Sequence, residues 1–148
     1  MLMIAGVKVK KLKIADKNRA RTIYEITSLK KSKCNKHIGY IKFKPNAKFM
    51  FHFHKDLDET YVPIEGKLVL FLYDARKRSK TLDKSMEIVI NAPTKISIPH
   101  GVEHAYLNPT KKKSHMILLS NHHWHKRYNI VDVKRKKDFL DKCGKYKG

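Results

Sequence analysis

Apolar and polar residues alternate over short stretches along most of this chain. The stretch VKVKKLKI (7–14) alternates apolar with basic side chains, while GKLVLFLYD (66–74) and HMILLS (115–120) are rich in aliphatic and aromatic residues. A period of two predicts strands, because successive side chains of a strand point to opposite faces. Further strands are predicted at 20–27, 37–44, 47–54, 86–93 and 95–99.

Turn-forming segments such as KPN (44–46) and NPTKKK (108–113) separate these strands, and no convincing amphipathic helix precedes residue 133. Many short strands at nearly regular spacing predict an all-β sandwich or barrel. Residues 1–132 are assigned to this single domain and residues 133–148 to a basic C-terminal tail. The tail could form a short helix around Lys136–Lys142, and it is interpreted as a solvated, partly frayed terminus in preference to a dedicated binding helix.

The charge of the chain is strongly unbalanced. Thirty-four Lys and Arg residues against thirteen Asp and Glu residues give a formal net charge of +21. Such an excess predicts an anionic partner, namely a phosphorylated metabolite, a nucleic acid or a membrane surface, with plain solubility as the alternative. Nucleic acid ranks last, because charge without a recognisable binding module is weak evidence.

Cys34 and Cys143 lie far apart and have no metal-finger spacing, so a reducing, cytoplasmic location is expected. The apolar run at the start of the chain is too short for a signal peptide. No stretch approaches the roughly 18 apolar residues that a membrane-spanning helix needs.

Many of the candidate functional residues lie in the stretch FMFHFHKDLDETYVPIEG (49–66). On a regular strand, Met50, His52 and His54 share one face, and the phenylalanines at 49, 51 and 53 share the other. Two imidazoles two residues apart on one face can converge on a single point. The sequence therefore predicts phenylalanine packing on one side of this strand and chemistry on the other.

Two spaced sets of residues give this chemistry a context. His52, His54, Glu59 and Gly66 form HxH(x4)E(x6)G, and IPHGVEHAYLN supplies PxGxxHxxxN with His104 as its histidine. Together they resemble the two motifs of the cupin superfamily, with Asn46 and Pro93 in place of the first glycine of each motif. The resemblance implies a double-stranded β-helix, a jelly-roll-like barrel in which the two motifs face each other across the mouth.

Three imidazoles and one carboxylate form a set of ligands that suits a divalent metal. His52, His54, Glu59 and His104 are the candidate ligands, and zinc, iron, manganese or nickel is the expected ion. The alternative is a polar barrel whose histidines are hydrogen-bonded and hold no metal.

A closer resemblance covers roughly residues 6 to 120. GVKVKKLKIADKNRARTIYEI, FLYDARKRSKT and IPHGVEHAY resemble segments of dTDP-4-dehydrorhamnose 3,5-epimerase-like proteins. That resemblance implies a homodimer acting on a nucleotide-linked or phosphorylated sugar in polysaccharide synthesis. Arg19, Glu25 and Arg76 match positions of these segments and are candidates for binding the anionic substrate.

The resemblance also implies proton abstraction next to a ketone, with epimerisation or ketone isomerisation as the outcome. His52 matches the family's base, Glu59 is the alternative proton carrier, and Tyr128 is the tyrosine nearest to the place of the family's acid. The cluster His122, His123 and His125 is interpreted first as a surface loop; alternatively it closes over the barrel mouth, with His123 contacting the substrate.

His52 cannot serve as a metal ligand and as a free base at once, because a liganded imidazole has no lone pair left to take a proton. A metal-binding cupin of another class, either a dioxygenase or a sensor of a small ligand, is therefore the competing interpretation.

Overall fold

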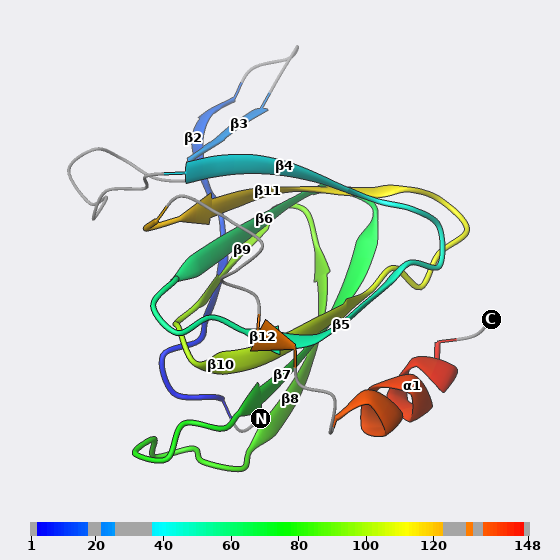
Figure 1. The fold of residues 1–148 in the computed structure, drawn as a ribbon. Helices are drawn as coiled ribbons and strands as arrows, with labels where there is room; N and C mark the ends of the chain where they lie inside the picture. Colours follow the sequence, from blue (N-terminus) through cyan, green and yellow to red (C-terminus); the bar gives the residue numbers. More distant parts are fainter. Residues whose placement is uncertain (1–2, 18–21, 26–36, 123–129, 132–134, 147–148) are drawn as a thin grey trace.

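A computed structural model describes residues 3–17, 22–25, 37–122, 130–131 and 135–146. The described part of the chain is predominantly β, with one short helix (Figure 1). The strands are β1 (Lys8–Lys11), β2 (Lys13–Lys17), β3 (Thr22–Glu25), β4 (His37–Phe43), β5 (Lys48–Phe53), β6 (Glu59–Glu65), β7 (Lys67–Asp74), β8 (Ser85–Asn91), β9 (Thr94–Ile98), β10 (Val102–Leu107), β11 (Ser114–Ser120) and β12 (Ile130–Val131), and the helix is α1 (Lys136–Gly144).

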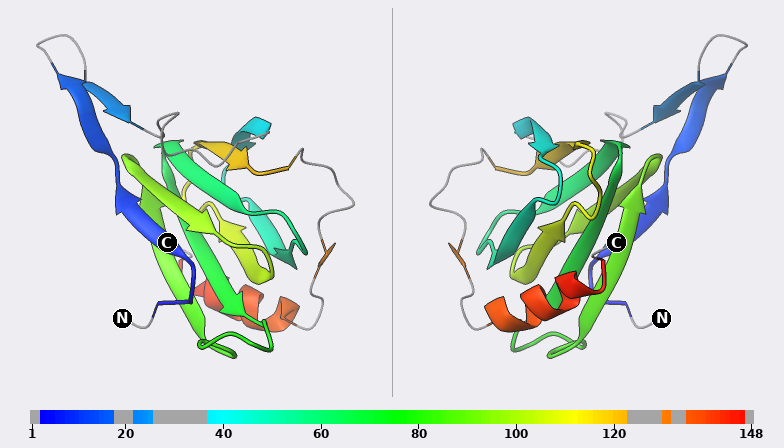
Figure 2. Two further views of the ribbon diagram at one scale, coloured as in Figure 1. Left: turned by 90° about the vertical axis from the view of Figure 1, so that its left-hand side faces the viewer. Right: turned by 90° about the vertical axis from the view of Figure 1, so that its right-hand side faces the viewer.

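Two five-stranded antiparallel sheets form the body of the molecule. One has the order β1-β9-β6-β11-β4, and the other has the order β12-β5-β10-β7-β8. The remaining pair, β2 and β3, forms a separate two-stranded hairpin that extends away from the barrel in both views of Figure 2. The all-β barrel expected from the strand pattern is confirmed.

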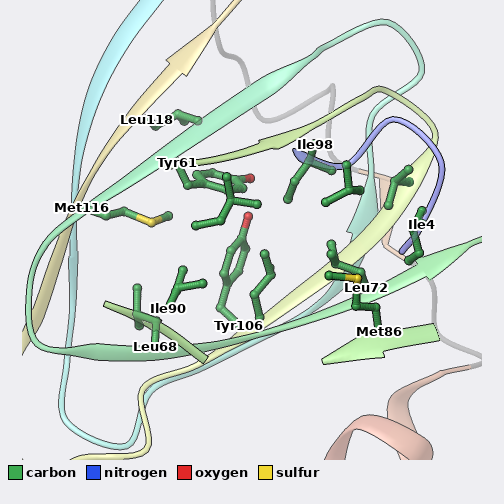
Figure 3. Packing of buried hydrophobic residues seen from close by; sticks show 14 residues of the cluster. Ile4, Tyr61, Leu68, Leu72, Met86, Ile90, Ile98, Tyr106, Met116 and Leu118 are labelled. Carbon is green, nitrogen blue, oxygen red and sulfur yellow. The ribbon is translucent and has the colours of Figure 1, made fainter. Parts of the chain in front are cut away.

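The main core lies between the two sheets. Leu70 of β7, Ile96 of β9 and Met116 of β11 are fully buried there, and Figure 3 shows side chains from both sheets meeting in this space. Strand β7, for example, contributes the alternate residues Leu68, Leu70 and Leu72, as expected from the period of two. Burial of these apolar side chains is the main term that holds the sheets together.

The prediction that the phenylalanines of β5 share one face is wrong for Phe49. A register shift between β5 and β10 places two residues of β5, Met50 and Phe51, against one residue of β10, Ala105. Phe49 therefore lies on the same face as His52, with their ring centroids 4.8 Å apart. Met50 joins Phe51 on the opposite face instead.

The helix α1 covers that opposite face. Phe139 is fully buried and meets Phe51 and Phe71 edge to face, with ring centroids 5.9 Å and 5.4 Å apart. Arg135, just before the helix, bonds Glu103 at 2.6 Å and stacks over the ring of Tyr73. The short C-terminal helix expected from the sequence is therefore present, and the interpretation of the tail as solvated and frayed is wrong for the described residues 135–146. The assigned boundary at residue 132 lies outside the described residues.

No helix in the described part of the chain is long and apolar enough to cross a membrane.

Candidate functional site

Four side chains predicted from the sequence motifs converge inside one end of the barrel. His52 lies on β5, and His54 directly follows the end of that strand. Glu59 begins β6, and His104 lies on β10. Each is at most 4% exposed. Each imidazole offers a ring nitrogen that lies within 4.8 Å of the nitrogens of the other two. The structure thus brings both motifs together, as the resemblance implied.

Backbone carbonyls fix the orientation of two of these imidazoles. Nδ1 of His52 lies 3.0 Å from the carbonyl oxygen of Met50, and Nδ1 of His104 lies 2.9 Å from that of Val102. A carbonyl oxygen only accepts, so Nδ1 carries the proton in both rings. Each bond runs to the residue two positions earlier, which lets the strand hold its own imidazole in one orientation.

Glu59 lies between two imidazoles. Its Oε2 atom lies 3.3 Å from Nε2 of His54 and 3.2 Å from Nε2 of His104. The same oxygen accepts a short hydrogen bond from the hydroxyl of Tyr61. Glu59 therefore accepts from Tyr61 and lies close to the ring nitrogens of two imidazoles in a buried setting.

The two candidate bases, His52 and Glu59, differ in charge: one is neutral and the other is ionised. Burial, reinforced by the neighbouring His104, lowers the pKa of His52 to about 2, so this imidazole is neutral. Burial alone would raise the pKa of Glu59, but the hydrogen bonds with His104 and His54 outweigh it and hold that pKa below its usual range. The cluster thus contains a neutral imidazole next to an ionised carboxylate.

Two tyrosines complete the site, and the sequence motifs did not single them out. Tyr61 follows Glu59 by two residues and Tyr106 follows His104 by two residues, so each shares a face with its motif residue. The Tyr61 hydroxyl also lies 3.3 Å from Nε2 of His104. Figure 3 shows the hydroxyls of Tyr61 and Tyr106 pointing toward one another. The period of two within each motif strand was the signal that could have identified both.

A cavity of about 360 Å³ opens beside the cluster. Its polar lining includes His52, Glu59 and Tyr61, whereas His54 and His104 do not line it. Aromatic and aliphatic side chains form most of the remaining wall, including Phe43, Phe49, Ile41, Met116 and Leu118. A few polar groups in an otherwise apolar cavity are typical of a small-molecule site.

Arg76 does not reach this cavity. Its guanidinium bonds the buried carboxylate of Asp74 through Nε and Nη2, both at 2.8 Å, and the carbonyl of Ala5 at 2.6 Å. Ser79 and Thr81 donate to the same carboxylate, each at 2.6 Å. The segment D-x-R-x-x-S-x-T therefore forms a hydrogen-bonded cluster after β7, and a role of Arg76 in substrate binding stays a prediction.

Glu25 is the one remaining predicted residue that the structure describes. Glu25 ends β3, where it pairs with Lys13, and its contact with a substrate stays a prediction. Arg19, His123 and Tyr128 lie outside the described residues.

No family model and no curated protein matches the sequence. Solved structures do match. The dTDP-4-dehydrorhamnose 3,5-epimerase of Elizabethkingia anophelis NUHP1 superposes with a TM-score of 0.79 at 13% identity, covering 93% of this chain and 81% of that one.

Two ketoisomerases match over almost their whole length. The TDP-quinovose 3,4-ketoisomerase WlaRB of Campylobacter jejuni has a TM-score of 0.73 at 19% identity, covering 93% of this chain and 99% of that one. The sugar 3,4-ketoisomerase QdtA of Thermoanaerobacterium thermosaccharolyticum, solved in complex with TDP, has a TM-score of 0.72 at 17% identity, covering 97% and 98%. These likenesses show that the chain has the jelly-roll cupin fold, as the sequence resemblance implied.

Proposed function

We propose that this chain, which has the fold of these sugar-nucleotide epimerases and ketoisomerases, isomerises a nucleotide-linked keto sugar by moving a proton next to its ketone. The observation that carries the proposal is the pairing of a neutral His52 with an ionised Glu59 on the wall of one cavity. Both groups have a lone pair that accepts a proton. Their position inside a largely apolar wall suits a deoxysugar ring.

Ketone isomerisation is favoured over epimerisation. The chain covers 98–99% of the two ketoisomerases but 81% of the epimerase. Moving a carbonyl to the neighbouring carbon requires removal of a proton from that carbon, an enediolate intermediate, transfer of the hydroxyl proton of that carbon to the former ketone oxygen, and return of a proton to the former carbonyl carbon. The two C–H steps leave the total number of protons on the sugar unchanged.

His52 is the base in the metal-free protein. Since Nδ1 donates to the carbonyl of Met50, the lone pair resides on Nε2, and the fixed ring does not need to reorient before it takes a proton. The low pKa of His52 makes the free imidazole a weak base, so an ionised carboxylate nearby is needed to stabilise the imidazolium that forms.

We also propose a divalent metal as a cofactor, because the ligand set fits one. In His52 and His104 the Nδ1 atoms are held by carbonyls, an arrangement that commonly orients metal-binding imidazoles and leaves Nε2 for the ion. His52, His54 and His104 would hold it, with Glu59 adjacent. A bound metal would polarise the ketone and stabilise the enolate oxygen.

Metal binding changes which residue moves the proton. With His52 engaged as a ligand, Glu59 is the remaining acceptor on the cavity wall. Glu59 is ionised in the metal-free site, so it has a lone pair free to accept the proton.

A single experiment tests the reaction and separates the two versions of it. A panel of nucleotide-linked 4-keto sugars is incubated with the protein in D₂O, with and without prior chelation, and followed by NMR, while metal content is measured in parallel. We expect deuterium at the carbons next to the ketone and at the carbon that loses the carbonyl. If exchange survives chelation, His52 is the residue that removes the proton from the sugar. If exchange requires stoichiometric metal, Glu59 is that residue. No exchange with any sugar contradicts the function itself.

The homodimer also stays a proposal. Ile38 and Tyr40 of the edge strand β4 are 71% and 62% exposed, and Ile64 of β6 is 47% exposed. Apolar side chains of this size on the outer face of one sheet support association with a second copy. Light scattering of Ile38→Lys against the unaltered protein tests it: loss of a dimer is expected, and a wild-type monomer contradicts it.

A further inference from the structure

Three turns at one end of the barrel carry a concentration of lysines. The turns β4–β5, β6–β7 and β10–β11 lie at the same end, because Lys48 pairs with Leu107, Ser114 with Phe43, and His115 with Glu65. Figure 1 shows the β4–β5 and β10–β11 connections side by side. We name these six exposed residues the basic end: Lys44, Lys48, Lys67, Lys111, Lys112 and Lys113.

The turns of the basic end are fixed to one another. The amide of Asn46 donates to the carbonyl of Thr110 at 3.1 Å, and the Asn108 side chain donates to the carbonyls of Lys44 and Lys112 at 3.0 Å and 2.7 Å. Ser114 donates to the carbonyl of Lys67 at 3.0 Å. These bonds to main-chain carbonyls hold the turns in place, while the lysine side chains extend into solvent.

The third turn packs closely against the same group. Gly66 has a φ of +83°, and a Cβ atom there would lie 2.5 Å from the hydroxyl oxygen of Ser114. Only glycine allows this conformation and approach without strain. The main chain of the basic end is therefore fixed, and the lysine side chains extend from it.

Little in the basic end neutralises this charge. The segments 44–48, 65–67 and 108–113 contain one acidic residue, Glu65, against six lysines. Gathering like charges on a fixed frame costs free energy through self-repulsion, which an anionic partner would relieve. None of the six lysines lines the cavity, so the substrate of the proposed reaction does not account for them.

We propose that the basic end docks the protein onto an anionic lipid bilayer. The turns form the tip of the barrel, and a lysine-bearing tip suits an extended anionic surface. The same segments contain no arginine and no aromatic residue. Bidentate phosphate contacts and base stacking, which nucleic-acid sites commonly use, are therefore not available there. Lysine, a hydrated point charge on a flexible stem, suits diffuse attraction to lipid headgroups.

The test is co-sedimentation of the full chain with vesicles of phosphatidylcholine, with or without about one third phosphatidylserine. We expect binding to the anionic vesicles alone, weakening as salt rises. The triple variant Lys44→Glu, Lys48→Glu, Lys112→Glu should bind them at least about 100-fold more weakly, since each lysine contributes roughly a factor of five.

A control variant with the same charge exists at the other end. Lys77, Lys80 and Lys84 are exposed in the β7–β8 connection. This connection follows the Tyr73–Ser85 pair, whereas the basic end lies at the other end of the same two strands, next to the Lys67–Asn91 pair. Each reversal removes two charges, so either triple variant carries +15 instead of +21. Lys77→Glu, Lys80→Glu, Lys84→Glu should retain vesicle binding within about tenfold.

Three results would overturn the proposal. The first is no binding of the unaltered protein to anionic vesicles, and the second is an equal loss in both triple variants, which would mean net charge alone. The third is tighter binding to mixed-sequence duplex DNA than to vesicles, lost selectively in the basic-end variant, which would identify a nucleic-acid surface. The proton exchange proposed above is measured in the absence of lipid, so failure of docking and failure of catalysis are separate outcomes.

Discussion

Nε2 of His104 lies 3.2 Å from Oε2 of Glu59, while Nδ1 of the same ring lies 2.9 Å from the carbonyl oxygen of Val102. Both partners are acceptors when Glu59 is ionised. A neutral His104 would then direct a lone pair at a carboxylate in a buried site, which is unfavourable. To be favourable, the contact therefore requires a cation between the two atoms, which the proposed metal would supply.

Replacing Glu59 by Gln removes that requirement, because the amide can donate to Nε2. We expect Glu59→Gln to lower the rate of solvent deuterium exchange by about 100-fold or more, the usual cost of losing a group that transfers protons. Bound metal should fall in the same variant. Glu103→Gln is the matched control, since Glu103 neighbours His104 in sequence but bonds Arg135. Unchanged exchange and metal content in Glu59→Gln would exclude both roles of this carboxylate.

Tyr61→Phe tests the hydrogen bond that supports Glu59. The hydroxyl of Tyr61 donates to the ionised carboxylate, and a bond to a charged group contributes about 1.5–3 kcal/mol. We expect the free energy of unfolding to fall by about that amount, measured by urea denaturation. Tyr106→Phe removes a hydroxyl from the same cavity without a bond to Glu59, and should cost about 1 kcal/mol or less. Equal losses in the two variants would argue against a special role for Tyr61.

The lowered pKa of the Asp74 carboxyl group makes the stability of the protein depend on pH in the acid range. Burial alone would raise its pKa, but bonds from Arg76, Ser79 and Thr81 outweigh it and hold the pKa well below the usual range. An unfolded aspartate titrates near 3.9, so as pH falls through about 4 the unfolded chain takes up the proton first. The contribution of Asp74 to stability is therefore present above that pH and is lost below it.

Asp74→Asn should remove this dependence and lower the free energy of unfolding at neutral pH by about 2–3 kcal/mol. Melting temperatures measured from about pH 3 to about pH 7, on both sides of the usual carboxyl pKa, provide the measurement. Asp83→Asn is the control, because Asp83 is exposed and accepts one bond from Tyr73. If Asp74→Asn loses stability in acid as steeply as the unaltered protein, Asp74 is not the group responsible.

The strand pattern predicted much of this architecture, and its failures have physical reasons. Strands predicted at 37–44 and 66–74 are observed as His37–Phe43 and Lys67–Asp74. The pattern did not single out β6, which contains Pro63, or β10, in which all six residues are buried. A strand buried on both faces does not alternate, so a period of two cannot reveal it.

The parts of the site that depend on the spacing of residues along one strand could be predicted from the sequence. The parts that depend on how two strands pair could not. The HxH spacing on one strand brings His52 and His54 close, and Asn46 adopts a φ of 54° where the cupin motif has glycine, a conformation that asparagine tolerates. The position of Phe49 depends on the register shift between β5 and β10, which involves residues more than fifty positions apart. Single-strand reasoning therefore placed Phe49 on the wrong face.

The docking of α1 gives the last prediction. Phe139 is fully buried against Phe51 and Phe71, whereas its neighbour Leu140 is 40% exposed. Removing a buried phenylalanine side chain costs about 3–5 kcal/mol, through lost apolar contact and the cavity left behind. Phe139→Ala should therefore lower the free energy of unfolding by about that amount, and Leu140→Ala by about 1 kcal/mol or less. Urea denaturation measures both, and limited proteolysis should cut the tail of Phe139→Ala first. Equal, small effects of the two substitutions would mean that α1 contributes nothing to the barrel and that the terminus is frayed after all.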